Sequence, residues 1–359
     1  MSVQDDALLL YQSHSMGLDL AYRRLRGIKV SRVRMNVIWA DAVADGQREL
    51  KKKPRRVRYD WARYDRAIRD ARQRGVKVHL SLAGPAPAWA TPAKTSERGH
   101  FKPNVRKFRK FVKAFARRYR GKVDRYSIWN EPNWRGWLGP PQKAPLLYRK
   151  LYRAGYKAIR RKSPRSRVLL GELAPYGQRR RAMAPLKFLR KMTCLDGRYR
   201  KKRRLSKRRC RGKLRADGVA HHPYDFDKPP WKKRPGRDNV TIANLGRLNK
   251  ALAKLKRRRV LVPRRARKMP VHLTEYGYFR SGPRRISERK RARWTVKAYK
   301  IAKRTPHVKS MLYYVFAPPP NGVFDLSLVD VDGDKTRTWR KLRRWTRNNR
   351  VKRPERWRA

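Results

Sequence analysis

The sequence contains few acidic residues and no long apolar run. Its 359 residues include 25 Asp and Glu against 101 Lys and Arg, which gives a formal net charge of +76. Because no stretch of about eighteen apolar residues occurs, we expect no membrane-spanning helix. The first residues also lack the basic and apolar regions of a signal peptide. Either the signal has been removed from a secreted or cell-surface protein, which is what we expect, or the protein is cytoplasmic.

The excess of positive charge would attract nucleic acids, anionic glycans or acidic membrane surfaces. No zinc-finger spacing, RNA-recognition signature or Gly-rich phosphate loop accompanies it, however. Most basic residues fall on the solvent faces of expected helices. They are denser in residues 200–215 and near the C-terminus, where we interpret residues 347–359 as a basic tail. We expect no specific nucleic-acid partner, only non-specific binding of polyanions.

Cysteine is nearly absent, and no pattern predicts a metal or a cofactor. Cys194 and Cys210 enclose a basic loop of fifteen residues, which a disulfide could close in an oxidising compartment; two free buried thiols are the alternative. The adjacent His221 and His222 would point to opposite faces of a strand, so they cannot readily bind one metal ion. The segment 330–334 has its Gly two positions too early for a calcium loop.

Short β-branched or apolar runs alternate with long basic amphipathic stretches, which is typical of repeated β/α units. The predicted strands are residues 7–11, 31–38, 76–82, 125–129, 168–171, 217–221, 271–274 and 310–316. The predicted helices are residues 18–27, 59–75, 104–119, 144–163, 182–192, 239–258, 287–305 and 336–346. Eight pairs suit a closed (β/α)8 TIM barrel of the α/β class better than an open sheet. No linker divides the series, so residues 1–346 are predicted to form a single catalytic domain.

Two predicted strands end in carboxylates. The fourth strand runs into Asn130-Glu131-Pro132, and the seventh into Glu275. Strands four and seven lie on nearly opposite sides of an eight-stranded barrel, so their terminal carboxylates should face each other across its mouth. Glycoside cleavage requires two such carboxylates, one protonated and one ionised. Burial and mutual repulsion would separate their pKa values.

With Trp129-Asn130-Glu131-Pro132-Asn133 after strand four and Glu275 after strand seven, the chain resembles clan A of the glycoside hydrolases, near families 5 and 39. The resemblance spans essentially the whole chain. It implies that Glu131 is the acid/base, that Glu275 is the nucleophile and that the reaction retains the anomeric configuration. It also implies that Asn130 hydrogen-bonds the sugar 2-hydroxyl.

Three further residues match elements of that clan. Arg34, on the second strand, resembles the buried arginine that keeps the nucleophile ionised. His222 and Tyr224, after the sixth strand, match a His-x-Tyr element that lines the site, and Tyr224 would donate its hydroxyl to Glu275. Glu172, at the end of the fifth strand, is either a core hydrogen-bonding partner or a substrate contact.

Aromatic side chains beyond the strand ends are candidates for packing against sugar rings. These are Trp39, Trp89, Trp134 and Trp137. Many clan members place a Trp at the end of strand eight, where this chain has Phe316, so we expect Phe316 to form a narrower platform.

The function predicted from the sequence is hydrolysis of O-glycosidic bonds by double displacement through a covalent glycosyl-enzyme intermediate. The expected partner is an oligo- or polysaccharide, and the expected state is a monomer without cofactor. Two alternatives stay open: a non-catalytic carbohydrate- or polyanion-binding barrel, and a transglycosylase. The sugar and the linkage do not follow from these residues.

Overall fold

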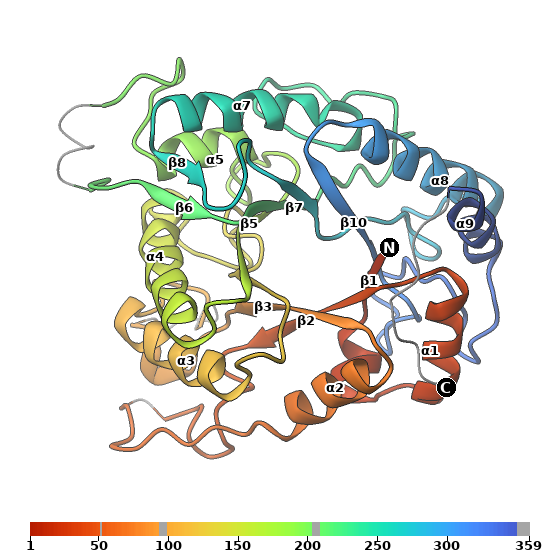
Figure 1. The fold of residues 1–359 in the computed structure, drawn as a ribbon, viewed down its shortest axis with the longest axis horizontal. Helices are drawn as coiled ribbons and strands as arrows, with labels where there is room; N and C mark the ends of the chain where they lie inside the picture. Colours follow the sequence, from red (N-terminus) through yellow and green to blue (C-terminus); the bar gives the residue numbers. More distant parts are fainter. Residues whose placement is uncertain (51, 93–98, 203–208, 350–359) are drawn as a thin grey trace.

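Eight parallel strands close into a barrel in the computed structural model, which describes residues 1–50, 52–92, 99–202 and 209–349 (Figure 1). Around the barrel they follow the order β1-β10-β9-β7-β5-β4-β3-β2. Their bounds are β1 Ser2–Gln4, β2 Arg32–Ile38, β3 Lys77–Ala83, β4 Arg125–Ile128, β5 Arg167–Leu173, β7 Gly218–His221, β9 Val271–Leu273 and β10 Val308–Tyr314. The predicted (β/α)8 barrel is confirmed.

Two short strands lie outside the barrel. β6 (Leu214–Ala216) and β8 (Leu261–Pro263) pair in parallel as a separate sheet, which the sequence patterns did not predict. The sixth, seventh and eighth barrel strands are therefore β7, β9 and β10. The ends of β4 and β9, which precede Glu131 and Glu275, are three strands apart around the barrel.

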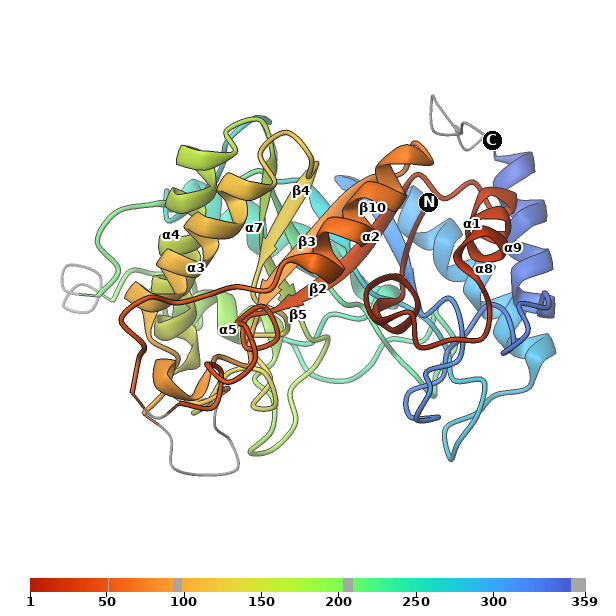
Figure 2. The same ribbon diagram turned by 90° about the horizontal axis from the view of Figure 1, so that it is seen from below.

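Helices surround the barrel (Figures 1 and 2), and the side chains that they bury are mostly apolar. In the described parts of the chain the α-helices are α1 Leu18–Gly27, α2 Ala62–Gln73, α3 Val105–Arg118, α4 Ala144–Lys162, α5 Pro185–Met192, α7 Gly246–Arg257, α8 Glu288–Arg304 and α9 Arg337–Asn348. In α3, Phe108, Phe111 and Phe115 are buried at helical spacing. Asn104 caps this helix, because its side chain accepts a hydrogen bond from the Lys107 amide.

The prediction of the first strand was wrong. Residues 7–11 form a π-helical turn, and the first strand is Ser2–Gln4. Leu8, Leu9 and Leu10 are all buried, and an apolar run that is buried on every side carries no periodicity that could separate strand from helix. The short strand β1 closes the barrel, since Ser2 pairs with Arg32 on one side and with Leu312 on the other.

Cys194 and Cys210 form a disulfide, which is one of the two alternatives that the sequence left open. It joins the residues that follow α5 to the segment that leads into β6. The expected basic tail, residues 347–359, begins inside α9, and its residues 350–359 lie outside the described residues. Within the described ranges, no helix is both long and apolar enough to cross a membrane.

Candidate active site

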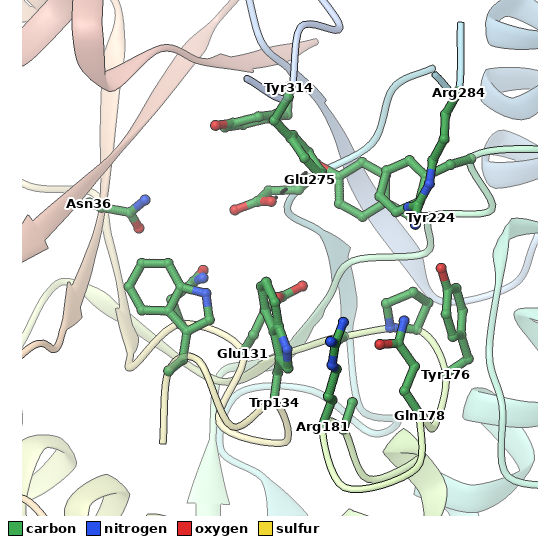
Figure 3. A pocket seen from close by; sticks show the side chains of 17 residues that line it. Asn36, Glu131, Trp134, Tyr176, Gln178, Arg181, Tyr224, Glu275, Arg284 and Tyr314 are labelled. Atoms are coloured by element: carbon green, nitrogen blue, oxygen red, sulfur yellow. Dashed lines mark hydrogen bonds between the residues drawn. The ribbon is translucent and has the colours of Figure 1, made fainter. Parts of the chain in front are cut away.

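The C-terminal ends of the barrel strands surround a pocket of about 370 Å³, into which Glu131 and Glu275 point (Figure 3). Both side chains are buried in the protein and line the pocket. This is the end of the barrel where loops after parallel strands build functional sites. The structure thus brings together the two carboxylates that the sequence placed on strands four and seven.

The chain around Glu131 has an unusual backbone conformation. Trp129 and Glu131 have φ angles of 68° and 33°, in the left-handed region that non-glycine residues rarely occupy. Trp129 is fully buried, and its indole nitrogen donates a hydrogen bond of 2.8 Å to the carbonyl of Trp137. Trp129 thus anchors the start of the turn, and Asn130 and Glu131, which follow it, line the pocket.

Glu275 accepts hydrogen bonds from two residues, one on β2 and one in the loop after β7. Arg34 Nη1 lies 2.8 Å from Glu275 Oε1, and the hydroxyl of Tyr224 donates to Oε2 at 3.1 Å. Both contacts stabilise the ionised carboxylate, because each donor strengthens when the acceptor is charged. The two residues thus occupy the places expected for them.

Arg34 is fully buried and connects the two glutamates of strands five and seven. Its Nε and Nη2 donate to both carboxylate oxygens of Glu172, at 2.9 and 2.5 Å. Nη2 also lies 2.8 Å from Asn130 Oδ1. Glu172 is itself fully buried and does not line the pocket. Of its two candidate roles, the structure supports the core hydrogen-bonding partner.

His222 lies between the two pocket carboxylates. Its Nδ1 is 2.9 Å from Glu131 Oε1 and 3.5 Å from Glu275 Oε2. Burial lowers the pKa of His222 well below its usual value, and the nearby charge of Arg34 acts in the same direction. The imidazole is therefore neutral, and a proton on Nδ1 is positioned to donate to Glu131.

The surroundings of Glu131 and Glu275 give the two carboxyl groups different pKa values. Burial raises the pKa of Glu131 well above the usual range, and the charge of Glu275 raises it further. Burial also raises the pKa of Glu275, to about 7, but Arg34 and the Tyr224 hydroxyl oppose that rise. Glu131 therefore keeps its proton to higher pH, while Glu275 is the member of the pair that ionises first.

The aromatic predictions were partly wrong. Trp134, which is 40% exposed, and Trp137 line the pocket. Trp39 is fully buried and stacks on Phe111 at 5.8 Å, while Trp89 is 5% exposed and donates its indole N–H to the carbonyl of Gln47. Both belong to the core beneath the loops, because a position just past a strand end can face either the pocket or the helices.

Phe316 was also assigned wrongly. It is fully buried and absent from the pocket wall, where Tyr314 lies instead (Figure 3). Gly277 makes room for this arrangement: a Cβ at that position would lie 2.4 Å from the carbonyl oxygen of Tyr314. The end of β10 can thus approach the chain that carries Glu275.

Several pocket residues were missed. Asn36 follows Arg34 by two positions on β2, so strand alternation places both on the inner face and could have revealed it. No comparable signal marks Tyr176, Gln178, Arg181 or Arg284, which come from loops after β5 and β9. Among the described residues, no cluster of three or more His, Cys, Asp or Glu side chains could hold a metal ion.

The barrel resembles in fold solved glycoside hydrolases of families 5 and 39, the families whose motifs the sequence resembles. No protein-family model matches the chain, and no curated protein matches its sequence. Solved structures do match it.

One is a family 39 glycoside hydrolase from the gut symbiont Bacteroides cellulosilyticus, with 16% identity and a TM-score of 0.62 over 96% of this chain and 62% of that one. A monomeric β-xylosidase from Caulobacter crescentus has 17% identity and a TM-score of 0.62, covering 96% and 67%. The endoglucanase Cel5A from Thermotoga maritima has 14% identity and a TM-score of 0.54, covering 89% and 88%. At these identities the likeness is one of fold, and this chain spans less than two thirds of the first enzyme.

Proposed function

We propose that this protein is a retaining glycoside hydrolase that acts on an oligo- or polysaccharide. The observation that carries the proposal is the position of His222 Nδ1, 2.9 Å from Glu131 and 3.5 Å from Glu275. The two nearest carboxylate oxygens can be no farther apart than the sum of these distances. That limit accommodates the roughly 5 to 5.5 Å separation of a retaining pair, so the contact supports double displacement.

In the first step Glu131 donates its proton to the glycosidic oxygen while Glu275 attacks the anomeric carbon, which breaks the bond to the leaving sugar. Arg34 and Tyr224 favour the ionised form of Glu275, which is the form that attacks. In the second step Glu131, now ionised, takes a proton from water while the water oxygen bonds to the anomeric carbon. The bond from that carbon to Glu275 breaks, which restores the Glu275 carboxylate and releases the sugar with its original configuration. Asn130 lies beside Glu131 in the pocket, where it can bind the sugar 2-hydroxyl.

Azide separates the two roles. Glu275→Ala should abolish detectable turnover, and azide bound in the vacated space should restore cleavage of an activated aryl glycoside with an inverted glycosyl azide as product. Glu131→Ala should lower kcat by about 10²–10⁴-fold, and azide should then give a product of retained configuration.

The product configuration is read by NMR after a screen of chromogenic glycosides and polysaccharides has found a substrate. Wild-type activity in either variant would contradict the assignment. Binding of glycans without any cleavage by the wild type would instead identify a non-catalytic carbohydrate-binding barrel, and sugar acceptors that outcompete water would identify a transglycosylase.

The disulfide between Cys194 and Cys210 supports a secreted or cell-surface location, because disulfides persist in oxidising compartments.

A further inference from the structure

Two arginines line the candidate active-site pocket without a carboxylate partner of their own. Arg181 and Arg284 both reach the pocket, yet neither forms an ion pair within the described ranges of the chain. Among the residues that the structure describes, the acidic residues on the pocket wall are Glu131 and Glu275. Glu275 already pairs with Arg34, and Glu131 is the proposed acid/base. The positive charges of Arg181 and Arg284 can therefore bind a ligand.

Both arginine side chains are exposed to solvent, and each is partly constrained by its surroundings. Arg181 belongs to a tight turn in which the Gln178 amide donates to the Ala182 carbonyl at 2.9 Å and the Ala182 amide donates back at 3.0 Å. The Arg181 carbonyl accepts a 2.7 Å hydrogen bond from the Arg135 amide, which anchors the turn to the loop that follows Glu131. Fixing the backbone reduces the entropy lost when the guanidinium binds an anion.

Arg284 comes from the loop after β9 and is oriented by an aromatic ring. Its guanidinium lies 5.9 Å from the ring centre of Phe226, within the range of a cation–π contact. In Figure 3, Arg181 rises beside Trp134 and Arg284 descends from the opposite wall near Tyr176. The two guanidinium groups thus approach the same end of the pocket.

This end is distinct from the one that would bind the attacked sugar. Asn36 and Tyr314 lie at the other end of the pocket (Figure 3). Beyond the arginines the surface continues into a second hollow, which shares Tyr176, Gln178 and Arg284 with the pocket. The acidic residue of that hollow, Asp227, pairs with Arg234 at 2.6 Å and forms no ion pair with Arg284 in the part of the chain that the structure describes.

We infer that the substrate is an acidic glycan, and that Arg181 and Arg284 bind an anionic group, a carboxylate or a sulfate, on the sugar at the leaving side of the scissile bond. This inference rests on the function proposed above. A guanidinium presents parallel donors that match both oxygens of a carboxylate or of a sulfate. Trp134 and Tyr176 offer ring faces for the same sugar, while the anion would lie between the two arginines.

The test compares acidic glycans with chemically neutralised counterparts. Uronate oligosaccharides from hyaluronan and alginate are paired with their carboxyl-reduced forms, and carrageenan oligosaccharides with their desulfated forms. The wild type should favour the acidic member of at least one pair, and the preferred pair distinguishes a carboxylate from a sulfate. In Arg181→Gln and in Arg284→Gln, the ratio of kcat/KM for the acidic over the neutral member should fall about tenfold or more.

The matched control is the double variant Arg179→Gln/Arg285→Gln. It removes the same charge from the same two loops at positions that do not line the pocket. An acid preference that the control lowers as much as Arg181→Gln/Arg284→Gln does, or no acid preference in the wild type, would overturn the inference. If no glycoside at all is cleaved, the proposed function fails, and calorimetric titration of the same paired oligosaccharides then tests the anion site separately.

Discussion

Arg34 binds two carboxylates, one in the core and one that faces the pocket. Towards Glu172 it forms a closed, fully buried ion pair, while towards Glu275 it offers a single donor to a group that faces the pocket. The contact with Glu172 fixes the plane of the guanidinium group. The N–H that Arg34 donates to Glu275 therefore keeps a constant direction. A lysine could supply the charge here but not this geometry, because an ammonium lacks the planar fork.

The burial of Glu131 should make the protein less stable as the pH rises. Its pKa in the folded protein lies well above the ordinary value of 4.5, so with rising pH the unfolded chain gives up this proton first and the free energy of unfolding falls. Glu131→Gln should therefore raise the melting temperature at pH 7, and the gain should disappear below about pH 4.5.

Glu288 provides the opposite case. Burial raises the pKa of Glu288, but hydrogen bonds from Arg291 and Thr338 lower it more and hold it below the usual value. Glu288→Gln should thus lower the melting temperature at pH 7 and have less effect in acid. Calorimetry of both variants at pH 4 and pH 7 checks the two signs, and equal effects at both pH values would argue against them.

Trp39 and Trp134 provide a second pair of opposites. Trp39 is fully buried and packed against aromatic rings, so Trp39→Ala should lower the free energy of unfolding by about 3–5 kcal/mol. Trp134 is 40% exposed at the pocket, so Trp134→Ala should weaken substrate binding and leave the melting temperature nearly unchanged. Urea unfolding and KM measurements on each variant separate the effects, and a lowered melting temperature for Trp134→Ala would contradict this view.

At the scale of elements, the disulfide closes the segment between α5 and β6 far from the catalytic pocket. The bonded cysteines are 16 residues apart, and a loop of this size predicts a stabilisation of about 3 kcal/mol. Cys194→Ser/Cys210→Ser should lower the midpoint of urea unfolding accordingly, while kcat/KM stays unchanged. A loss of activity without a loss of stability would show that the loop contributes to the site.

The alternation of strands and helices could be predicted because each element carries its own periodic pattern. Helix α1 has the predicted bounds, residues 18–27. The start of the last barrel strand was misplaced by only two residues, 310 against Val308. Residues 7–11 failed for a physical reason: an unbroken apolar run fits any buried conformation.

The candidate site could be predicted where a residue lies on a strand or directly after it. Glu131, Glu275 and Arg34 are such residues, since the barrel itself dictates where they point. Trp39 and Arg181 lie in loops, and for them the prediction from the sequence failed. Whether a loop side chain faces the pocket or the helices depends on contacts between loops that are distant in sequence, and no local pattern encodes those contacts.

At the scale of the whole molecule, the charge of +76 should produce non-specific binding to polyanions. The wild type should be retained strongly on immobilised heparin and be released by salt, because screening shortens the range of these forces. Arg181→Gln/Arg284→Gln and Arg179→Gln/Arg285→Gln should elute at nearly the same salt concentration, since each removes two charges of many. A much earlier elution of the first variant would mean that heparin enters the pocket.

The pairing of β1 with β10 sets the order in which this chain can fold. Ser2 has its partner at Leu312, so the first strand emerges from the ribosome long before the last one exists. At about 5–20 residues per second, the wait is roughly 15–60 s. During that time β1 has no β10 to pair with, so its edge stays open, and open strand edges are prone to pair with other chains. Yield in a heterologous host should therefore depend on how nascent chains are protected, even though the finished barrel has no free edge.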